Sequence, residues 1–238
     1  MDDFDPLTTR RHPTATRPLL GLTVLVVEDS RFACEAIRLL CLRSGARIRR
    51  ADCLASARRH LQVYRPSVVI IDLGLPDGSG ADLIAEMDAM TPRVGVILGM
   101  SGDDGAEPLA MQSGADGFLA KPVASLAAFQ QAILSHMPAD RQPTGPRILN
   151  DDRVSPDPVA YRDDLAHAAE LLGEDHEGAV LDYRAQFVGG VARSAEDGAL
   201  ESAARALALS RSQDRASRSD VARLAGLVQA RLAERIAI

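Results

Sequence analysis

The most unusual feature of this 238-residue sequence is its single lysine. Of the 27 basic residues, 26 are arginine, and Lys121 stands alone before Pro122 at the end of a short apolar run. The lysine ammonium is a compact point charge on a flexible stem, whereas guanidinium is a broad planar fork, so the two are not interchangeable where one small anionic group is met end-on. Lys121 is therefore predicted to be a site residue.

Other reactive side chains also close apolar runs. Glu28 and Asp29 close one run, Asp72 a second and Ser101 a third. Clustered carboxylates repel one another, and their hard oxygen atoms suit Mg²⁺, which prefers one or two carboxylates plus waters and substrate phosphate. With such a cation in place, one carboxylate can attack a phosphoryl group, while a lysine and a hydroxyl neutralise the charge on its oxygens. These groups predict phosphoryl chemistry on an aspartate, with Mg²⁺ as the cofactor.

Strand-like runs and helix-period stretches alternate five times over about 120 residues, which is typical of a doubly wound parallel α/β sheet. Strands are expected at 23–27, 46–49, 67–71, 94–98 and 117–120, and helices at 32–43, 54–64, 81–90, 105–113 and 125–137. Ligands bind such sheets outside the carboxyl ends of the strands. All the reactive side chains fall there, so the sheet is expected to bring them together.

Each of these residues also has an ordinary structural interpretation. Asp29 or Ser30 could cap the following helix, Ser101 could open a turn, and Lys121 could be a solvated residue before a helix. Their joint convergence on one edge of the sheet favours the functional interpretation.

Composition places the chain among globular proteins. It is 46% hydrophobic, has a formal charge of −6 and has a pI near 5.4, which argues against a basic nucleic-acid-binding surface. Cys34, Cys41 and Cys53 have neither metal-ligand nor disulfide-framework spacing. Residues 1–18 mix polar residues and proline without periodicity, so they are expected to be a flexible arm rather than a signal peptide. No apolar stretch approaches the length of a membrane span, and a cytoplasmic location is expected.

The last third of the chain is predicted to be a separate helical bundle, at 159–238. Five prolines occur from Pro138 to Pro158 inclusive, so residues 139–158 are expected to be a linker. Helical periodicity follows at 160–172, 177–195, 199–209 and 220–236. An antiparallel bundle requires apolar stripes, and two are present: Val180, Tyr183, Phe187 and Val191 in one, and Val221, Leu224, Val228, Leu232 and Ile236 in the other. From residue 150 onward, 16 acidic residues face 11 arginines, a charge of −5. Such a charge makes this part a poor candidate for DNA binding.

Residues 19–138 resemble the receiver domain of two-component response regulators, which has a flavodoxin-like fold. The motifs that carry the resemblance are the acidic pair Glu28–Asp29, Asp72, the turn at 75–78 (Leu-Pro-Asp-Gly), Ser101 and the pair Lys121–Pro122. The resemblance implies that Asp72 is the phosphoacceptor and that Ser101 and Lys121 hold the phosphoryl group.

The same resemblance implies a metal site and a switch. Asp29, Asp72 and the backbone carbonyl of Gly74 would bind Mg²⁺ directly, and Glu28 would act through water. Phe118 occupies the place of the aromatic residue that moves inward together with Ser101 when a receiver is activated. An ordinary core aromatic residue remains the alternative for Phe118.

The helical part is similar, more faintly, to histidine phosphotransfer domains. In the stretch 204–210, Arg205 stands where the phosphorylatable histidine would be, Ala208 where a lysine would be and Leu209 where a glycine would be. The resemblance implies a docking module without phosphotransfer activity; an unrelated bundle is the alternative. His167 and His176 are expected to be surface residues.

The leading interpretation is a phosphorylation-controlled switch rather than an enzyme, with at most self-phosphorylation and self-dephosphorylation activity. Its expected partners are a histidine kinase or a phosphotransfer protein, and a downstream protein that contacts the helical part; a homodimer is left open, and a membrane is not expected. A DNA-binding transcriptional regulator is the alternative function. A third possibility is a metal-dependent phosphatase that acts on other molecules, which would need a cap that selects the substrate. The helical part could be such a cap, but the turn after Asp72 and the pair Lys121–Pro122 fit a receiver better.

Overall fold

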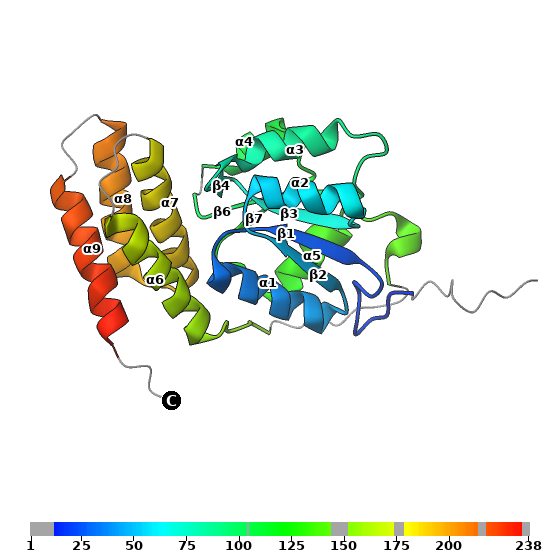
Figure 1. Cartoon of the computed structure of the whole chain (residues 1–238). Coiled ribbons are helices and arrows are strands. Elements are labelled where there is room, and N and C mark those ends of the chain that lie inside the picture. Colours follow the sequence, from blue (N-terminus) through cyan, green and yellow to red (C-terminus); the bar gives the residue numbers. More distant parts are fainter. Residues whose placement is uncertain (1–11, 104, 144–151, 174–178, 214–217, 235–238) are drawn as a thin grey trace, which may run out of the picture.

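The computed structural model describes residues 12–103, 105–143, 152–173, 179–213 and 218–234, and of residues 179 and 180 only the backbone. These residues form an α/β part and an all-helical part that lie side by side (Figure 1). The predicted fold class, a doubly wound five-stranded parallel sheet followed by an all-α bundle, is confirmed.

The sheet has five parallel strands in the order β2-β1-β3-β6-β7. They are β1 Thr23–Val27, β2 Arg47–Ala51, β3 Val68–Asp72, β6 Val96–Ser101 and β7 Gly117–Ala120. The central strands β3 and β6 are buried throughout, which explains their continuous apolar sequences. β2 lies at an edge, where Arg47, Arg49 and Arg50 discourage pairing with a further strand.

Five helices cover the two faces of this sheet. α1 Arg31–Ser44 and α5 Leu126–Leu134 pack on one face, and α2 Leu54–Val63, α3 Gly80–Asp88 and α4 Glu107–Gln112 on the other. Strand side chains alternate between the two cores: Val24 and Val26 meet α1, whereas Leu25 and Val27 meet α2 and α3. Burying each such side chain contributes about 1.5–3 kcal/mol.

Helix α1 has well-defined ends. Ser30 caps its first turn, and its last turn closes at Gly45, whose φ of 85° favours glycine. Cys34 and Cys41 of this helix face the core of the α/β part, and burial raises the pKa of the Cys41 thiol to about 12. Both cysteines therefore serve as apolar core residues.

The segment predicted as a linker contacts the α/β part where it is described. Ala139–Arg141 forms a short 3-10 turn, η1. Further on, the Leu126 backbone N–H donates to the Asp152 carbonyl, and the Val154 N–H donates to the Ala124 carbonyl. The Val154 side chain is buried in the core of the α/β part. The chain therefore enters the helical part from a position pinned beside α5.

Four helices form the second part: α6 Pro158–Gly173, α7 Ala179–Ser194, α8 Gly198–Ser212 and α9 Arg218–Ala233. They share one apolar core, to which Leu165, Phe187, Leu207 and Leu224 belong. Of the predicted stripes, Phe187, Val191, Leu224 and Val228 are buried, while the side chain of Val180 and all of Ile236 lie outside the described residues. Throughout the described chain, every helix is too short or too polar to cross a membrane.

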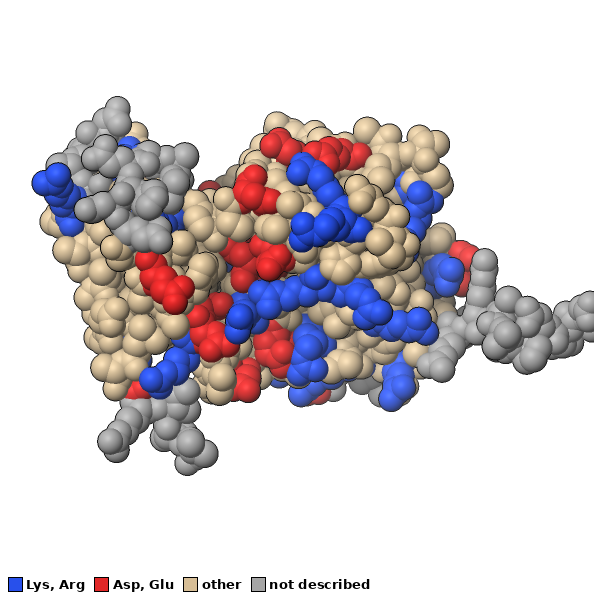
Figure 2. Space-filling model, in the orientation of Figure 1, with Lys and Arg blue, Asp and Glu red and all other residues tan. Residues whose placement is uncertain are grey.

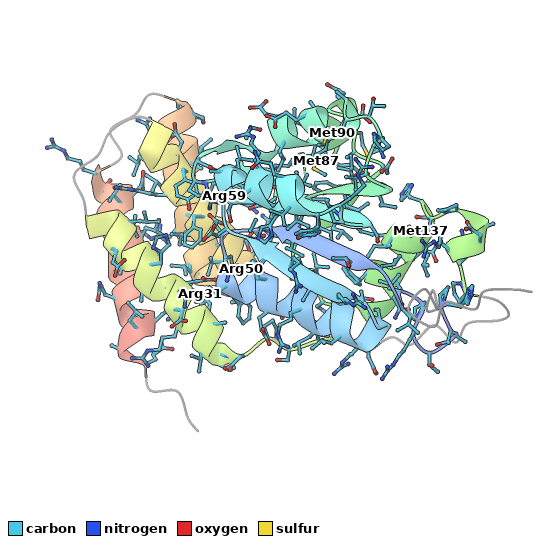
Figure 3. The ribbon with its side chains drawn as sticks, turned by 45° about the vertical axis from the view of Figure 1, so that its right-hand side comes forward. Arg31, Arg50, Arg59, Met87, Met90 and Met137 are labelled. Carbon is cyan, nitrogen blue, oxygen red and sulfur yellow. The ribbon has the colours of Figure 1, made fainter. Side chains whose placement is uncertain are left out.

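The two parts contact each other closely, because α6 and α7 both pack against α1. Figure 2 shows acidic side chains gathered at the junction, next to a band of basic side chains over the surface of the α/β part. Arg31 and Arg50 lie at the edge of the α/β part that faces the bundle (Figure 3). The junction falls on the edge of the sheet where the candidate site residues were predicted.

Candidate functional site

The predicted site residues meet at the carboxyl edge of the sheet. Glu28 and Asp29 follow β1, Asp72 and Ser101 are the last residues of β3 and β6, and Lys121 follows β7. Backbone hydrogen bonds continue past the strand ends: the Glu28 N–H donates to Ala51, and the Lys121 N–H to Ser101, each at 2.9 Å. Parallel pairing therefore aligns side chains that lie up to 93 positions apart in the sequence.

Lys121 connects two of the carboxylates. Its Nζ lies 2.7 Å from Glu28 Oε2 and 3.1 Å from Asp72 Oδ2, and all three residues are buried. Burial alone would lower the pKa of Lys121, but the carboxylates of Asp72 and Glu28 raise it above its ordinary value. The ammonium therefore stays charged and gives the site one fixed positive charge.

The acidic cluster carries more negative charge than this lysine can balance. Glu28, Asp29 and Asp72 each offer one oxygen within 4.8 Å of the others. Burial raises the pKa of Asp72 to about 7 despite the nearby Lys121, and burial together with Glu28 and Asp72 raises the pKa of Asp29. Three hard oxygen donors facing one ammonium fit a divalent cation such as Mg²⁺.

Two predicted switch residues lie beside the cluster. Ser101 is buried, and its Oγ accepts a hydrogen bond from the Asp103 backbone N–H at 3.1 Å. Phe118 on β7 is partly buried and lies opposite Gly99 of β6, packed against the core under α4. This placement agrees with both the switch role and the core-aromatic alternative.

The turn at 75–78 lies between two short strands, β4 Gly74–Leu75 and β5 Gly78–Ser79, which pair in antiparallel fashion. Asp77 in this turn accepts hydrogen bonds from the N–H groups of Leu54 and Ala55 at 2.8 and 2.9 Å. Its carboxylate thus holds the start of α2, and its role is structural.

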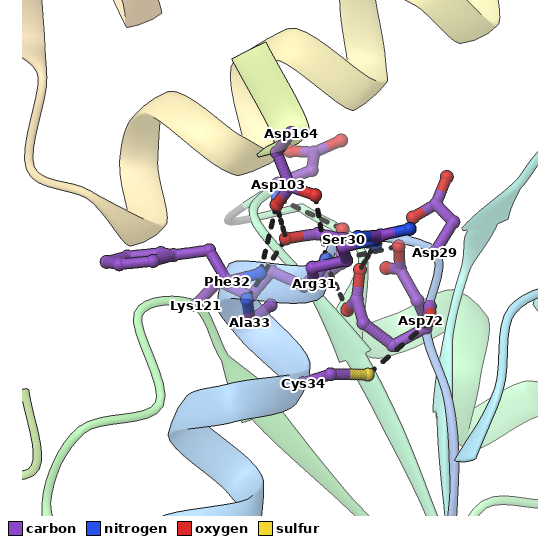
Figure 4. Close-up of polar contacts among 12 residues, drawn as sticks. Asp29, Ser30, Arg31, Phe32, Ala33, Cys34, Asp72, Asp103, Lys121 and Asp164 are labelled. Atoms are coloured by element: carbon purple, nitrogen blue, oxygen red, sulfur yellow. Dashed lines mark hydrogen bonds and ion pairs between the residues drawn. The ribbon is translucent and has the colours of Figure 1, made fainter. Parts of the chain in front are cut away.

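The helical part contributes residues to the site that no sequence motif indicated. Asp164 of α6 is buried and accepts three hydrogen bonds at the start of α1 (Figure 4). Its Oδ1 accepts from the Arg31 N–H at 2.8 Å. Its Oδ2 accepts from the Phe32 N–H at 3.0 Å and from the Ser30 hydroxyl at 2.7 Å. Ser30 Oγ in turn accepts from the Ala33 N–H. A carboxylate at the positive end of α1 is favoured by the unpaired N–H groups and the helix dipole.

A second contact reaches the acidic cluster. The Tyr183 hydroxyl of α7 donates to Asp29 Oδ2 at 2.6 Å, and Arg50 donates to the Asp29 backbone carbonyl at 2.9 Å. Asp29 is therefore held from the bundle through its carboxylate and from β2 through its backbone. Sequence reasoning had assigned Tyr183 to the interior stripe of the bundle.

A cavity of about 600 Å³ lies between the acidic cluster and helices α7 and α8. Its lining includes Asp72, Lys121, Gln186, Gly190 and Arg205. The cavity is large enough for a phosphoryl group and several waters, each of which takes about 30 Å³ in the liquid. The phosphoacceptor candidate thus faces a chamber shared by both parts of the chain.

The residues singled out in the helical part lie as follows. Arg205 on α8 lines the shared cavity, and its guanidinium contacts Glu201 Oε1 at 3.0 Å. Ala208 also lines the cavity, whereas Leu209 is exposed. His167 is exposed on α6, with its ring edge-on to Phe187 at a centroid distance of 5.4 Å. His176 lies outside the described residues.

Residues 24–133 match the family model of the response regulator receiver domain, and this part of the chain is a receiver domain. It is similar to the KDP operon transcriptional regulatory protein KdpE of Escherichia coli, with 29% identity over 99 residues, which is 42% of this chain and 44% of KdpE. It is also similar to the transcriptional regulatory protein CitB of Klebsiella pneumoniae, with 34% identity over 107 residues, covering 43% of this chain and 45% of CitB.

The match therefore spans less than half the length of these curated relatives and lies in the receiver domain alone. Among solved structures, a response regulator from Chloroflexus aurantiacus is 27% identical, with a TM-score of 0.44, and the match covers 48% of this chain and 98% of that one. The receiver domain of a sensor histidine kinase from Pseudomonas aeruginosa, solved with magnesium in its active site cleft, is 24% identical, with a TM-score of 0.43, over 48% of this chain and 95% of that one.

Proposed function

We propose that this chain is a response regulator that accepts a phosphoryl group on Asp72 from a histidine kinase or a phosphotransfer protein. The proposal rests on one observation: at one edge of the sheet, Lys121 contacts Asp72 and Glu28, and the carboxylate of Asp29 lies beside them. The output would run through protein contacts of the helical part, and the only reactions of the chain itself would be the gain and loss of this phosphoryl group.

In the transfer step, an Asp72 carboxylate oxygen attacks the phosphorus of the donor's phosphohistidine. A P–O bond forms, the P–N bond breaks, and its electron pair returns to the imidazole. Lys121 supplies positive charge to the phosphoryl oxygens, and Ser101, whose Oγ accepts from the Asp103 N–H, still has its own O–H to donate to them. Mg²⁺ held by Asp29, Asp72 and the Gly74 carbonyl, with Glu28 acting through water, would neutralise charge as the phosphoryl group moves.

The test is phosphorylation of the full chain with acetyl phosphate and Mg²⁺. One acid-stable, base-labile phosphoryl group is expected per chain, and Asp72→Asn or a chelator should abolish it. Asp103→Asn is the matched control, because Asp103 is an exposed aspartate in the lining of the same cavity. Retained labelling of Asp72→Asn would show that another residue is the acceptor.

DNA binding by the helical part is a second candidate, because the curated relatives are transcriptional regulators. The charge of −5 over residues 150–238 speaks against it. Tight binding of the phosphorylated chain to DNA, weakening steeply with salt, would favour this candidate over a protein partner.

A further inference from the structure

Gln186 of α7 occupies a space that Gly74 leaves open. Gly74 lies two residues after Asp72, and its backbone N–H donates a hydrogen bond to the Asp72 carboxylate. A Cβ on Gly74 would overlap the carboxamide of Gln186. The missing side chain therefore admits an amide from the helical part to a position next to the residue that hydrogen-bonds Asp72.

Contacts on either side fix this part of α7 over the site. Three residues before Gln186, the Tyr183 hydroxyl is bound to Asp29. Four residues after it, Gly190 faces Lys121, because a Cβ on Gly190 would lie 3.9 Å from the lysine Nζ. Residues three and four apart share one face of a helix, so Gln186 lies in the middle of the face that covers the site.

Gln186 does not belong to the apolar core of the bundle. Gln186 is exposed, unlike its neighbours Ala185 and Phe187, which belong to the core of the bundle. Its carboxamide offers two donors and one acceptor to the shared cavity, which also contains Asp72. A side-chain amide with both functions can hold a water molecule against a phosphoryl group, as a glutamine does for the attacking water in GTPases.

We propose that Gln186 orients the water that hydrolyses the aspartyl phosphate, so that the helical part limits the lifetime of the phosphorylated state. This inference rests on the proposed role of Asp72. The water oxygen bonds to phosphorus, and the bond between phosphorus and the Asp72 oxygen breaks, with its electron pair returning to the carboxylate. The water gives its protons to the phosphate and the solvent. The products are inorganic phosphate and free Asp72, and nothing is oxidised or reduced.

The experiment follows release of phosphate from full-length chain that has been phosphorylated with acetyl phosphate and freed of the donor, at saturating Mg²⁺. Gln186→Ala should slow release by about ten- to a hundredfold, the loss expected for one hydrogen bond to a charged group, with unchanged uptake. Gln186→Met should be equally slow, because it keeps the length of the side chain but has no amide. Gln213→Ala, an exposed glutamine at the end of α8, should release phosphate at the normal rate.

The outcomes separate the two proposals. If the unmodified chain takes up no phosphoryl group, the role of Asp72 fails and this inference fails with it. If uptake is normal and Gln186→Ala releases phosphate at the unmodified rate, the inference alone is overturned. Normal release by Gln186→Met would also overturn it, because packing rather than the amide would then account for any effect of alanine.

Discussion

At the scale of single residues, composition alone located the central charge of the site. The chain is rich in arginine and has one lysine, Lys121. The Nζ of this lysine lies between the buried carboxylates of Glu28 and Asp72. The spacing in the sequence also identified Asp29 and Ser101, because each follows or closes a strand. The roles of these side chains in phosphoryl transfer remain predictions, and substitutions can test them.

Lys121→Arg should behave as a damaging substitution although it conserves charge. The planar guanidinium of arginine cannot replace the compact lysine ammonium in its contact with the phosphoryl group. Phosphoryl uptake from acetyl phosphate should therefore fall at least tenfold. Since Lys121 is buried, the larger side chain should also lower the free energy of unfolding by about 1–3 kcal/mol through overpacking. Uptake kinetics and thermal denaturation measure the two effects.

Arg38→Lys on the exposed surface of α1 is the control for exchanging these two residue types. It should change neither uptake nor stability appreciably, because an exposed ion pair contributes at most about 1 kcal/mol. Normal uptake by Lys121→Arg would show that the site needs only a positive charge at this position.

At the scale of elements, the strands were the most predictable part of the fold. The run at 23–27 coincides with β1, which is continuously apolar because it is buried between two layers of helices. The run at 117–120 coincides with the partly buried edge strand β7. The short pair β4–β5 was not predicted, since two-residue strands carry no periodicity. Helix boundaries shifted by a few residues, as expected where caps rather than periodicity determine the ends.

The contacts between the two parts could not be predicted from the sequence. Asp164, Tyr183 and Gln186 form no motif, and each has an ordinary role in an isolated amphipathic helix. Their importance comes from the orientation of the bundle on α1, which depends on surface shape and on single hydrogen bonds. The proline-rich segment was predicted to be a linker, and the structure adds that the backbone of Asp152 and Val154 pairs with the chain at the start of α5.

Asp197 provides a prediction for the bundle. It caps α8 by accepting from the Leu200 N–H at 3.1 Å, and it also accepts from Arg231 of α9 at 2.6 Å and from the Tyr161 hydroxyl of α6 at 3.2 Å. Asp197→Ala should therefore destabilise the bundle by about 1–3 kcal/mol, measured by thermal denaturation at pH 7.

The same contacts predict a dependence on pH. The hydrogen bond from Arg231 lowers the pKa of the Asp197 carboxyl below its ordinary value. A lowered acid pKa stabilises the folded state above the unfolded pKa, near 3.9, and this stabilisation is lost as the pH falls through the folded value. The difference between the unmodified chain and Asp197→Ala should thus shrink in acid. Asp197→Asn keeps a cap without the charge and should be intermediate at pH 7; equal melting of all three would contradict this role.

At the scale of the whole molecule, the helical part covers the edge of the sheet on which the predicted chemistry depends. α6 and α7 contact α1 (Figure 1). The cavity over Asp72 is lined by both parts. A small phosphodonor fits a chamber of about 600 Å³, whereas a protein donor must bring a histidine on a helix to the same position. Transfer from a protein should therefore require the bundle to move away from α1.

Asp164→Ala should open this junction. The substitution removes the acceptor for the N–H groups of Arg31 and Phe32 and for the Ser30 hydroxyl. The bonds of Phe32 and Ser30 are buried, and a buried donor left without an acceptor costs about 1–3 kcal/mol. Amide hydrogen exchange at Arg31 and Phe32 should accelerate at least tenfold, and small-angle scattering should show a larger radius of gyration. The receiver core should keep its melting behaviour, because Ser30 still caps Ala33.

The neighbouring residue supplies the control for this prediction. Asp163 forms only an exposed ion pair with Arg31 at 2.7 Å among the described contacts, with 45% and 62% of the two side chains exposed. Such a pair contributes little, so Asp163→Ala should leave exchange and radius of gyration unchanged. If both variants open the molecule equally, surface charge rather than the buried cap holds the two parts together. If neither does, the apolar contacts of α6 and α7 with α1 are sufficient on their own.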